Sequence, residues 1–160
     1  MSGEGRVVSI YITPTGAAAM KALDQVQSVA GRGLEGDRYF AGLGTYSNDP
    51  GSGRHVTLIE IEATEALKRE YGVEMVVGQS RRNIVTRNVA LNHLVGREFL
   101  VGAVLLRGMR LCEPCAHLEK LTARGALRGL IHRGGLRADI ITGGTIRIGD
   151  SISTSTQRDR

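Results

Sequence analysis

Both cysteines of the chain lie in one short stretch, residues 110–118. Cys112 and Cys115 have C-x-x-C spacing, and His117 follows. Pro114 precedes Cys115, and proline is favoured at the first helical position; the apolar spacing after it predicts a helix that begins near Cys115. The positive end of a helix dipole favours a thiolate, the form that binds metals or attacks electrophiles. Cys115 is therefore the preferred working thiol, although free cysteine is also often buried as a small apolar side chain.

Three kinds of site remain open from the cysteine pair alone. A zinc site needs a second C-x-x-C or two suitably spaced histidines, and here only His117 and His132 stand near the pair. A dithiol redox site of the thioredoxin kind is expected within a βαβ pattern, which the surrounding sequence lacks. A cysteine hydrolase needs a histidine base oriented by a third group, and no nucleophile signature surrounds Cys115.

Arginine supplies a fourth interpretation, because the chain holds 21 lysine and arginine residues of which only three are lysine, with a net charge of +5. The planar guanidinium pairs with phosphate and carboxylate oxygens through two hydrogen bonds. An anion held beside a thiolate suits a metal shared by protein and cofactor. Taken singly, an arginine is more often a solvated surface residue, and the excess can reflect a GC-rich genome. The candidates to hold one anionic group are Arg38, Arg81, Arg82, Asn83, Thr86 and Arg133.

Length and composition narrow the function classes. A chain of 160 residues can bury a core large enough to fold unaided. It has no basic run with interleaved aromatic residues for stacking on bases, no N-terminal signal region, and no apolar run near the roughly 20 residues that span a bilayer. Two cysteines three apart make no disulfide framework. We therefore expect a cytoplasmic protein that acts on an anionic small molecule and binds neither nucleic acid nor membrane.

Short β-rich runs between glycine-rich turns predict a mainly β, barrel-like single domain over residues 1–153 with a few short helices, and a disordered tail over 154–160. A helix is expected over 60–71, ended by Gly72. Residues 17–30 fit a short helix or a helix followed by a strand. Residues 31–39 match G-x-G-x-x-G, but more glycines follow where a dinucleotide-binding helix would run, so no such site is expected. Strands are expected at 6–12, 56–59, 82–87, 98–106 (two, separated at Gly102), 136–142 and 145–153.

Six stretches in a fixed order resemble the MOSC domain, the module at the C-terminus of molybdenum-cofactor sulfurases that also occurs in small stand-alone proteins. The stretches are Gly33-Leu-Glu-Gly-Asp-Arg38, Ser80-Arg-Arg-Asn-Ile-Val-Thr-Arg87, Leu91-Asn-His-Leu-Val-Gly96, Glu98-Phe-Leu-Val-Gly102, Leu111-Cys-Glu-Pro-Cys115 and Gly144-Thr-Ile-Arg-Ile-Gly-Asp150. Together they run over most of the chain. The resemblance implies a mostly β, barrel-like fold, in agreement with the pattern above.

The same resemblance implies that Cys115 is the family's reactive cysteine. In sulfurase-type members it is proposed to carry sulfur; in oxidoreductase members it ligates the molybdenum of a pyranopterin cofactor and N-hydroxylated substrates are reduced. The arginine, asparagine and threonine candidates match the region that grips the cofactor's phosphate and pterin. With two cysteines the chain cannot ligate an iron–sulfur cluster through four thiolates, so electrons must come from a separate reductase.

The leading hypothesis is therefore a molybdenum-cofactor-binding protein with Cys115 as the metal ligand, a small-molecule substrate and an external electron-transfer reductase. A sulfur carrier with a persulfide on Cys115, served by a cysteine desulfurase, is the second hypothesis. A structural zinc-binding interaction domain is the third. The family mechanism does not require Cys112, whose role stays open.

Overall fold

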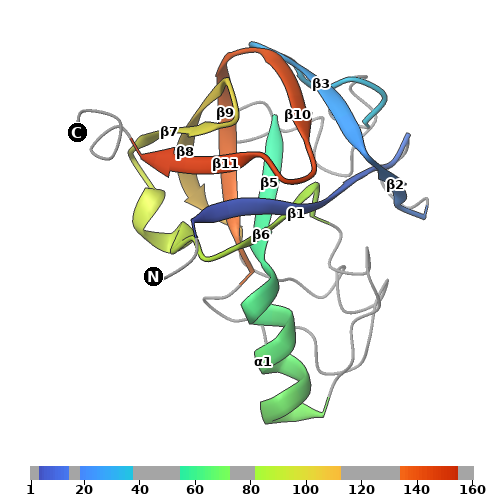
Figure 1. The fold of residues 1–160 in the computed structure, drawn as a ribbon, viewed down its shortest axis with the longest axis vertical. Helices are drawn as coiled ribbons and strands as arrows, with labels where there is room; N and C mark the ends of the chain where they lie inside the picture. The colour runs from blue at the N-terminus through green and yellow to red at the C-terminus, as the bar shows by residue number, and fades with distance from the viewer. Residues whose placement is uncertain (1–3, 15–18, 38–54, 73–81, 113–133, 155–160) are drawn as a thin grey trace.

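The computed structural model describes residues 4–14, 19–37, 55–72, 82–112 and 134–154. Within these ranges the chain is mainly β, with one α-helix and one 3-10 helix (Figure 1). The elements in chain order are β1 (Gly5–Ile12), β2 (Lys21–Leu23), β3 (Gln25–Val29), β4 (Gly33–Leu34), β5 (Val56–Glu60), α1 (Ile61–Tyr71), β6 (Ile84–Arg87), η1 (Leu91–Leu94), β7 (Glu98–Val101), β8 (Val104–Leu111), β9 (Leu136–Thr142), β10 (Gly144–Arg147) and β11 (Ser151–Thr154).

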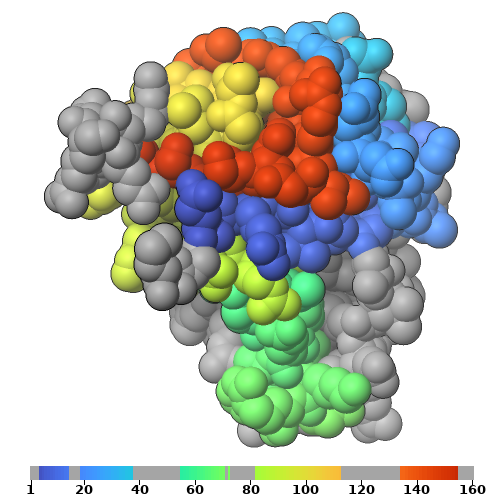
Figure 2. Space-filling model, viewed as in Figure 1, coloured from blue at the N-terminus to red at the C-terminus, as the bar shows by residue number. Residues whose placement is uncertain are grey.

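Seven of the described strands close into a barrel. Their hydrogen-bonded order is β11-β7-β8-β9-β5-β6-β1, and β1 closes the ring by pairing with β11 at Gly5↔Ile152. Figure 2 shows this closure on the surface, where the C-terminal strands pack directly against β1. Strands β5 and β6 run parallel, joined through α1, whereas the other barrel pairs are antiparallel. Strand β2 pairs with β1 outside the ring, and β10, β3 and β4 form a separate three-stranded sheet.

Alternate residues of β1, β5 and β6 fill two different apolar clusters, because successive side chains on a strand point to opposite faces. On β5, Val56 and Leu58 face the barrel interior, where Phe99 is among the largest fully buried side chains. Ile59 faces outward and packs with Leu67 of α1 in the second cluster. The helix therefore covers the outer face of the parallel pair.

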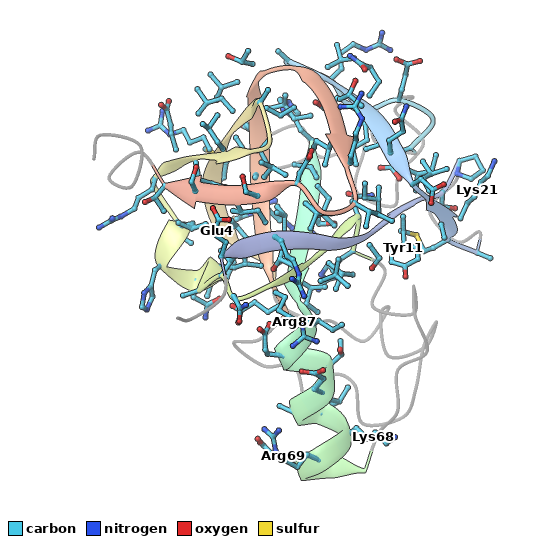
Figure 3. The ribbon with its side chains drawn as sticks, in the orientation of Figure 1. Glu4, Tyr11, Lys21, Lys68, Arg69 and Arg87 are labelled. Atoms are coloured by element: carbon cyan, nitrogen blue, oxygen red, sulfur yellow. The ribbon has the colours of Figure 1, made fainter. Side chains whose placement is uncertain are left out.

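Helix α1 follows β5 without a turn and extends away from the barrel (Figure 1). It ends at Gly72, which has left-handed backbone angles (φ 67°) and donates its N–H to the carbonyls of Leu67 and Lys68. Figure 3 shows Arg87 beside the start of the helix and Lys68 at its far end. The Arg87 guanidinium lies 3.1 Å from the carboxylate of Glu65, so an exposed ion pair joins β6 to α1. Neither described helix is long and apolar enough to cross a membrane.

Most of the expected elements are present in the described ranges. The strand at 136–142 and the helix ended by Gly72 are confirmed, and the two strands between 98 and 106 are separated around Gly102. The helix considered within 17–30 is wrong for its described part, which forms β2 and β3. In β3 burial alternates, with Val26 and Ser28 buried and Gln25 and Gln27 exposed, as expected for a strand with one face toward solvent. The expected helix after Cys115 and residues 155–160 lie outside the described residues, while Thr154 belongs to β11.

Candidate functional site

A buried polar network lies where the parallel strands β5 and β6 begin. Asn83 stands directly before β6 and Thr57 is the second residue of β5, so the parallel register places the two side by side. Asp37, which follows β4, and Thr13, which follows β1, complete the network. These four polar residues are buried, with exposed fractions between 0 and 3%, so their hydrogen bonds must be made inside the protein.

The side-chain amide of Asn83 makes four hydrogen bonds. Its Nδ2 donates to the carbonyl oxygen of Tyr11 at 3.0 Å and to Oδ1 of Asp37 at 3.3 Å. Its Oδ1 accepts from the N–H of Thr57 at 3.0 Å and from the Thr57 hydroxyl at 3.1 Å. Because a primary amide has two N–H donors and two lone pairs on its oxygen, Asn83 uses its full capacity on three separate segments of the chain.

The neighbouring Arg82 reaches a different part of the chain. Its Nε donates to the carbonyl of Gly134 at 2.7 Å and its Nη2 donates to the carbonyl of Cys112 at 3.0 Å. Arg82 is 6% exposed. The N–H of Cys112 also donates to the carbonyl of Gly135 at 2.7 Å. Residues 112 and 134 are therefore held together by one guanidinium, although 21 residues separate them in the sequence.

Glycine is required at position 135, where the chain held by Arg82 enters the barrel. Its φ is 102°, and a Cβ added there would clash with the carbonyl oxygen of Leu58. A side chain would both strain the backbone and push β9 away from β5. Glycine at this position lets the chain pass close to β5 as it enters β9.

Asp37, Arg82, Cys112 and Gly134, here called the anchor residues, are linked through Asn83 into one chain of contacts. Four candidate residues lie outside the described ranges but next to these anchors in the sequence: Arg38, Arg81 and Arg133 adjoin an anchor, and Cys115 is three residues from one. Since consecutive Cα atoms are about 3.8 Å apart, each of the three arginines starts within that distance of an anchor. The described residues next to these candidates are thus joined by one series of side-chain contacts and the Arg82–Asn83 peptide bond.

The comparison with family models decides the family. The model described as the MOSC domain matches residues 45–153. The chain belongs to the MOSC domain family. None of the curated proteins matches the sequence.

Solved structures share the fold of this MOSC domain. The crystal structure of the YuaD protein from Bacillus subtilis has a TM-score of 0.77 and 16% identity, with 94% of each chain covered. YiiM from Geobacillus stearothermophilus has a TM-score of 0.69 and 14% identity, over 94% of this chain and 74% of that one. YiiM from Escherichia coli has a TM-score of 0.66 and 16% identity, over 93% and 69% respectively. At these identities the likeness shows the fold and nothing further.

Thr86, the third described candidate of this MOSC domain, lies apart from the anchors. It is fully buried on β6, beside Glu60 in the register, and its hydroxyl donates to the carbonyl of Ile59 at 3.4 Å. The structure therefore joins Arg82 and Asn83 to the anchors and places Thr86 further along β6, bonded to β5.

Cys112, the second thiol of this MOSC domain, is free and 1% exposed. Its backbone rather than its sulfur takes part in the anchor contacts. Among the described residues no group of three or more histidine, cysteine, aspartate or glutamate side chains could hold a metal ion.

Sequence reasoning missed several residues at this site. Asp37 and Thr57 carry no motif of their own, and only the register that sets Thr57 beside Asn83 reveals them. Arg110 and Arg137, partners in the β8–β9 register, were missed too, although they stand two and three residues from Cys112 and Gly134. Their closeness in sequence to the cysteine pair and to Arg133 was the one available signal.

Glu60 marks the opposite end of β5 from this site. Burial raises the pKa of its carboxyl above the ordinary 4.5, while the hydrogen bond from the Leu91 N–H lowers the pKa and the nearby Glu62 carboxylate raises it. The Leu91 N–H lies 3.1 Å from Oε2 of Glu60. This partly buried carboxyl ties η1 to the start of α1, away from the anchor residues.

Proposed function

We propose that this MOSC protein binds a molybdenum cofactor of the pyranopterin type and reduces N-hydroxylated small molecules with it. The thiolate of Cys115 would be the protein ligand to molybdenum. The observation that supports the proposal is the set of contacts that joins the anchor residues, because Arg38, Arg81 and Arg133 each adjoin an anchor residue in the sequence and Cys115 is three residues from one. Family membership supports the same assignment through the resemblance of these stretches to cofactor-binding members.

The donor set suits such a cofactor. A soft thiolate is an appropriate ligand for a metal that also has cofactor sulfur around it, and guanidinium groups pair with phosphate oxygens through two hydrogen bonds. The Asn83 amide makes all four of its hydrogen bonds inside the protein, and Arg82 donates to two backbone carbonyls. Direct contacts to the phosphate and pterin therefore fall to Arg38, Arg81 and Arg133.

The local charge favours an anionic group. Arg110 and Arg137 are cross-strand partners in β8 and β9, close to the anchor residues Cys112 and Gly134. Together with Arg82 they concentrate positive charge near the ends of residues 113–133. A wall of one sign of charge raises the local concentration of oppositely charged ligands and speeds their association.

Each of the chain's own groups has a separate part in this proposal. The bound cofactor would supply the two-electron chemistry. Cys115 would hold the metal, and the three adjoining arginines would orient the phosphate and neutralise its charge. The Arg82–Asn83 pair would keep the segments that carry these groups in register. The electrons would come from a separate reductase, because a chain with two cysteines cannot supply four thiolates to an iron–sulfur cluster.

The test is molybdenum content, measured by mass spectrometry of the metal in protein purified from a host that makes the cofactor and from a matched host that cannot. We expect near-equimolar molybdenum only in the first host, its loss in Cys115→Ala, and its retention in the matched control Cys112→Ala. Reduction of a hydroxylamine by the loaded protein with an artificial electron donor then tests the reaction.

Other results of the same preparation would favour the alternatives. Background molybdenum in every sample would contradict the proposal. Without metal, a persulfide on Cys115 detected by protein mass spectrometry would favour the sulfur carrier. Near-equimolar zinc, lost in both Cys112→Ala and His117→Ala, would favour the structural zinc domain.

A further inference from the structure

We infer that Arg82 and Asn83 are positioning residues that shape the site through the chain segments they hold. Sequence reasoning placed both among the groups that bind the anion directly. The geometry instead directs the two side chains into the protein, one toward Asp37 and the other toward Cys112 and Gly134. The inference rests on the proposed function only for the identity of the working thiol, Cys115.

The two residues connect segments that are remote in the sequence. Asn83 bonds to Asp37, 46 residues away, and to the carbonyl of Tyr11, 72 residues away. Arg82 bonds to Cys112 and Gly134, 30 and 52 residues away. Since the two residues are consecutive, any shift of one segment is passed to the other through a single peptide unit. The pair therefore fixes the spacing between the chain at Asp37 and the chain at Cys112.

The link that Arg82 makes between Cys112 and Gly134 depends on the shape of the arginine side chain. Two different nitrogens of one guanidinium, Nε and Nη2, reach the carbonyls of Gly134 and Cys112 at 2.7 and 3.0 Å. The guanidinium presents its donors in a rigid planar fork, whereas lysine has one nitrogen on a flexible stem. Lysine at this position would keep the positive charge and lose the geometry.

That difference separates positioning from direct anion binding. If Arg82 acts by its charge, Arg82→Lys should behave much like the wild type. If it acts by holding residues 112 and 134 together, Arg82→Lys and Arg82→Gln should both weaken this link to a similar degree. Cys112 reports on the closure independently of any cofactor, because its buried thiol belongs to the residue whose carbonyl accepts the Arg82 bond.

The experiment is alkylation by iodoacetamide of the full-length protein made without cofactor. The alkylation of each cysteine is followed by peptide mass spectrometry. Arg69→Lys, at an exposed position near the far end of α1, is the matched control. We expect Cys112 to react about tenfold faster or more in Arg82→Lys and Arg82→Gln, with the control unchanged, because local opening exposes groups that the closed state protects. We also expect the rate of Cys115 alkylation to change in the same direction in both Arg82 variants.

Wild-type rates for both cysteines in Arg82→Lys, with altered rates only in Arg82→Gln, would overturn the inference in favour of a charge effect. Unchanged rates in both variants would overturn it as well. If neither variant folds, hydrogen exchange of the wild-type protein decides: the Cys112 N–H, bonded to Gly135, should exchange as slowly as the β8 amides, and fast exchange would reject the closure. Every readout uses protein without cofactor, so a failure to bind molybdenum leaves these results unaffected.

Discussion

Asn83→Asp is the most direct test of the buried network. It replaces the amide nitrogen by an oxygen, and the hydrogen bond to Asp37 becomes a repulsion between two carboxylates. The amide nitrogen that donates to Asp37 at 3.3 Å and to the Tyr11 carbonyl at 3.0 Å becomes a carboxylate oxygen. Two donated hydrogen bonds are lost and two carboxyl groups then face each other at a position with no exposure to solvent. The contacts from Thr57 to the other oxygen are retained.

The magnitude follows from these contacts. Each lost hydrogen bond is worth about 1 kcal/mol, so the pH-independent cost is about 2 kcal/mol. Two unit charges 3.3 Å apart repel by about 5 kcal/mol at an effective dielectric constant near 20. The protein relieves this repulsion by binding a proton, so the pKa of one carboxyl of the pair rises in the folded state. The folded variant then binds more protons than the unfolded chain, and its stability falls as pH rises.

The assay is urea unfolding followed by circular dichroism at several pH values, with Asn92→Asp on η1 as the control that adds the same charge at an exposed position. Relative to wild type, Asn83→Asp should lose about 3–4 kcal/mol near pH 5 and about 6–7 kcal/mol near pH 8, since ionisation above the unfolded pKa costs about 1.4 kcal/mol per pH unit until the repulsion is fully expressed. A deficit below about 1 kcal/mol, or one that is the same at both pH values, would refute the hydrogen-bond assignment of Asn83.

Two further substitutions test the fold around the site. Gly135→Ala should lower stability by more than about 2 kcal/mol in thermal unfolding because its Cβ would clash with the carbonyl of Leu58. The control is Gly149→Ala, which is also at positive φ but has no atom within 4 Å of the added Cβ. An equal loss of stability in both variants would contradict the close approach of Gly135 to β5. Glu60→Gln should gain stability relative to wild type as pH rises past 4.5, because burial raises the pKa of Glu60 and the folded wild type pays for ionising it; parallel pH profiles for the two proteins would contradict this.

The elements that the sequence predicted well are those whose local signals and tertiary environment agree. Residues 60–71 combine helical spacing with a glycine that adopts the left-handed cap, and α1 ends there. The strand at 136–142 alternates cleanly between buried and more exposed positions. The prediction of a helix was wrong for residues 21–29 because a short strand with polar outward positions has no distinct helical or strand period in the sequence. Pairing of β3 with β10, more than a hundred residues away, decides its structure, and no local window contains that information.

At the candidate site, residue types indicated which residues are involved but not the role of each. The sequence singled out Arg82 and Asn83 from their chemistry, and both do lie at the anchor residues. Their partners could not be predicted, because three of them are backbone carbonyls and two are buried side chains in other parts of the chain. Thr86 shows most clearly that residue type alone does not give the role, since its hydroxyl donates to the backbone carbonyl of Ile59 on β5. The roles of Cys115, Arg38, Arg81 and Arg133 stay predictions.

The position of the anchor residues follows from the one parallel pair among the described barrel strands. Parallel neighbours need a crossover, and here α1 takes that part while covering the outward residues Ile59 and Val85. The helix occupies the outer face beyond the carboxyl ends of β5 and β6, which leaves their amino ends uncovered by α1. Thr57 and Asn83 lie at those amino ends, and there the buried polar network can reach the chain at Asp37. A barrel with antiparallel neighbours at this point would bring the start of one strand beside the end of the next. The crossover is thus the reason that Thr57 and Asn83 lie side by side at the amino ends of β5 and β6, where Asn83 can bond to Asp37.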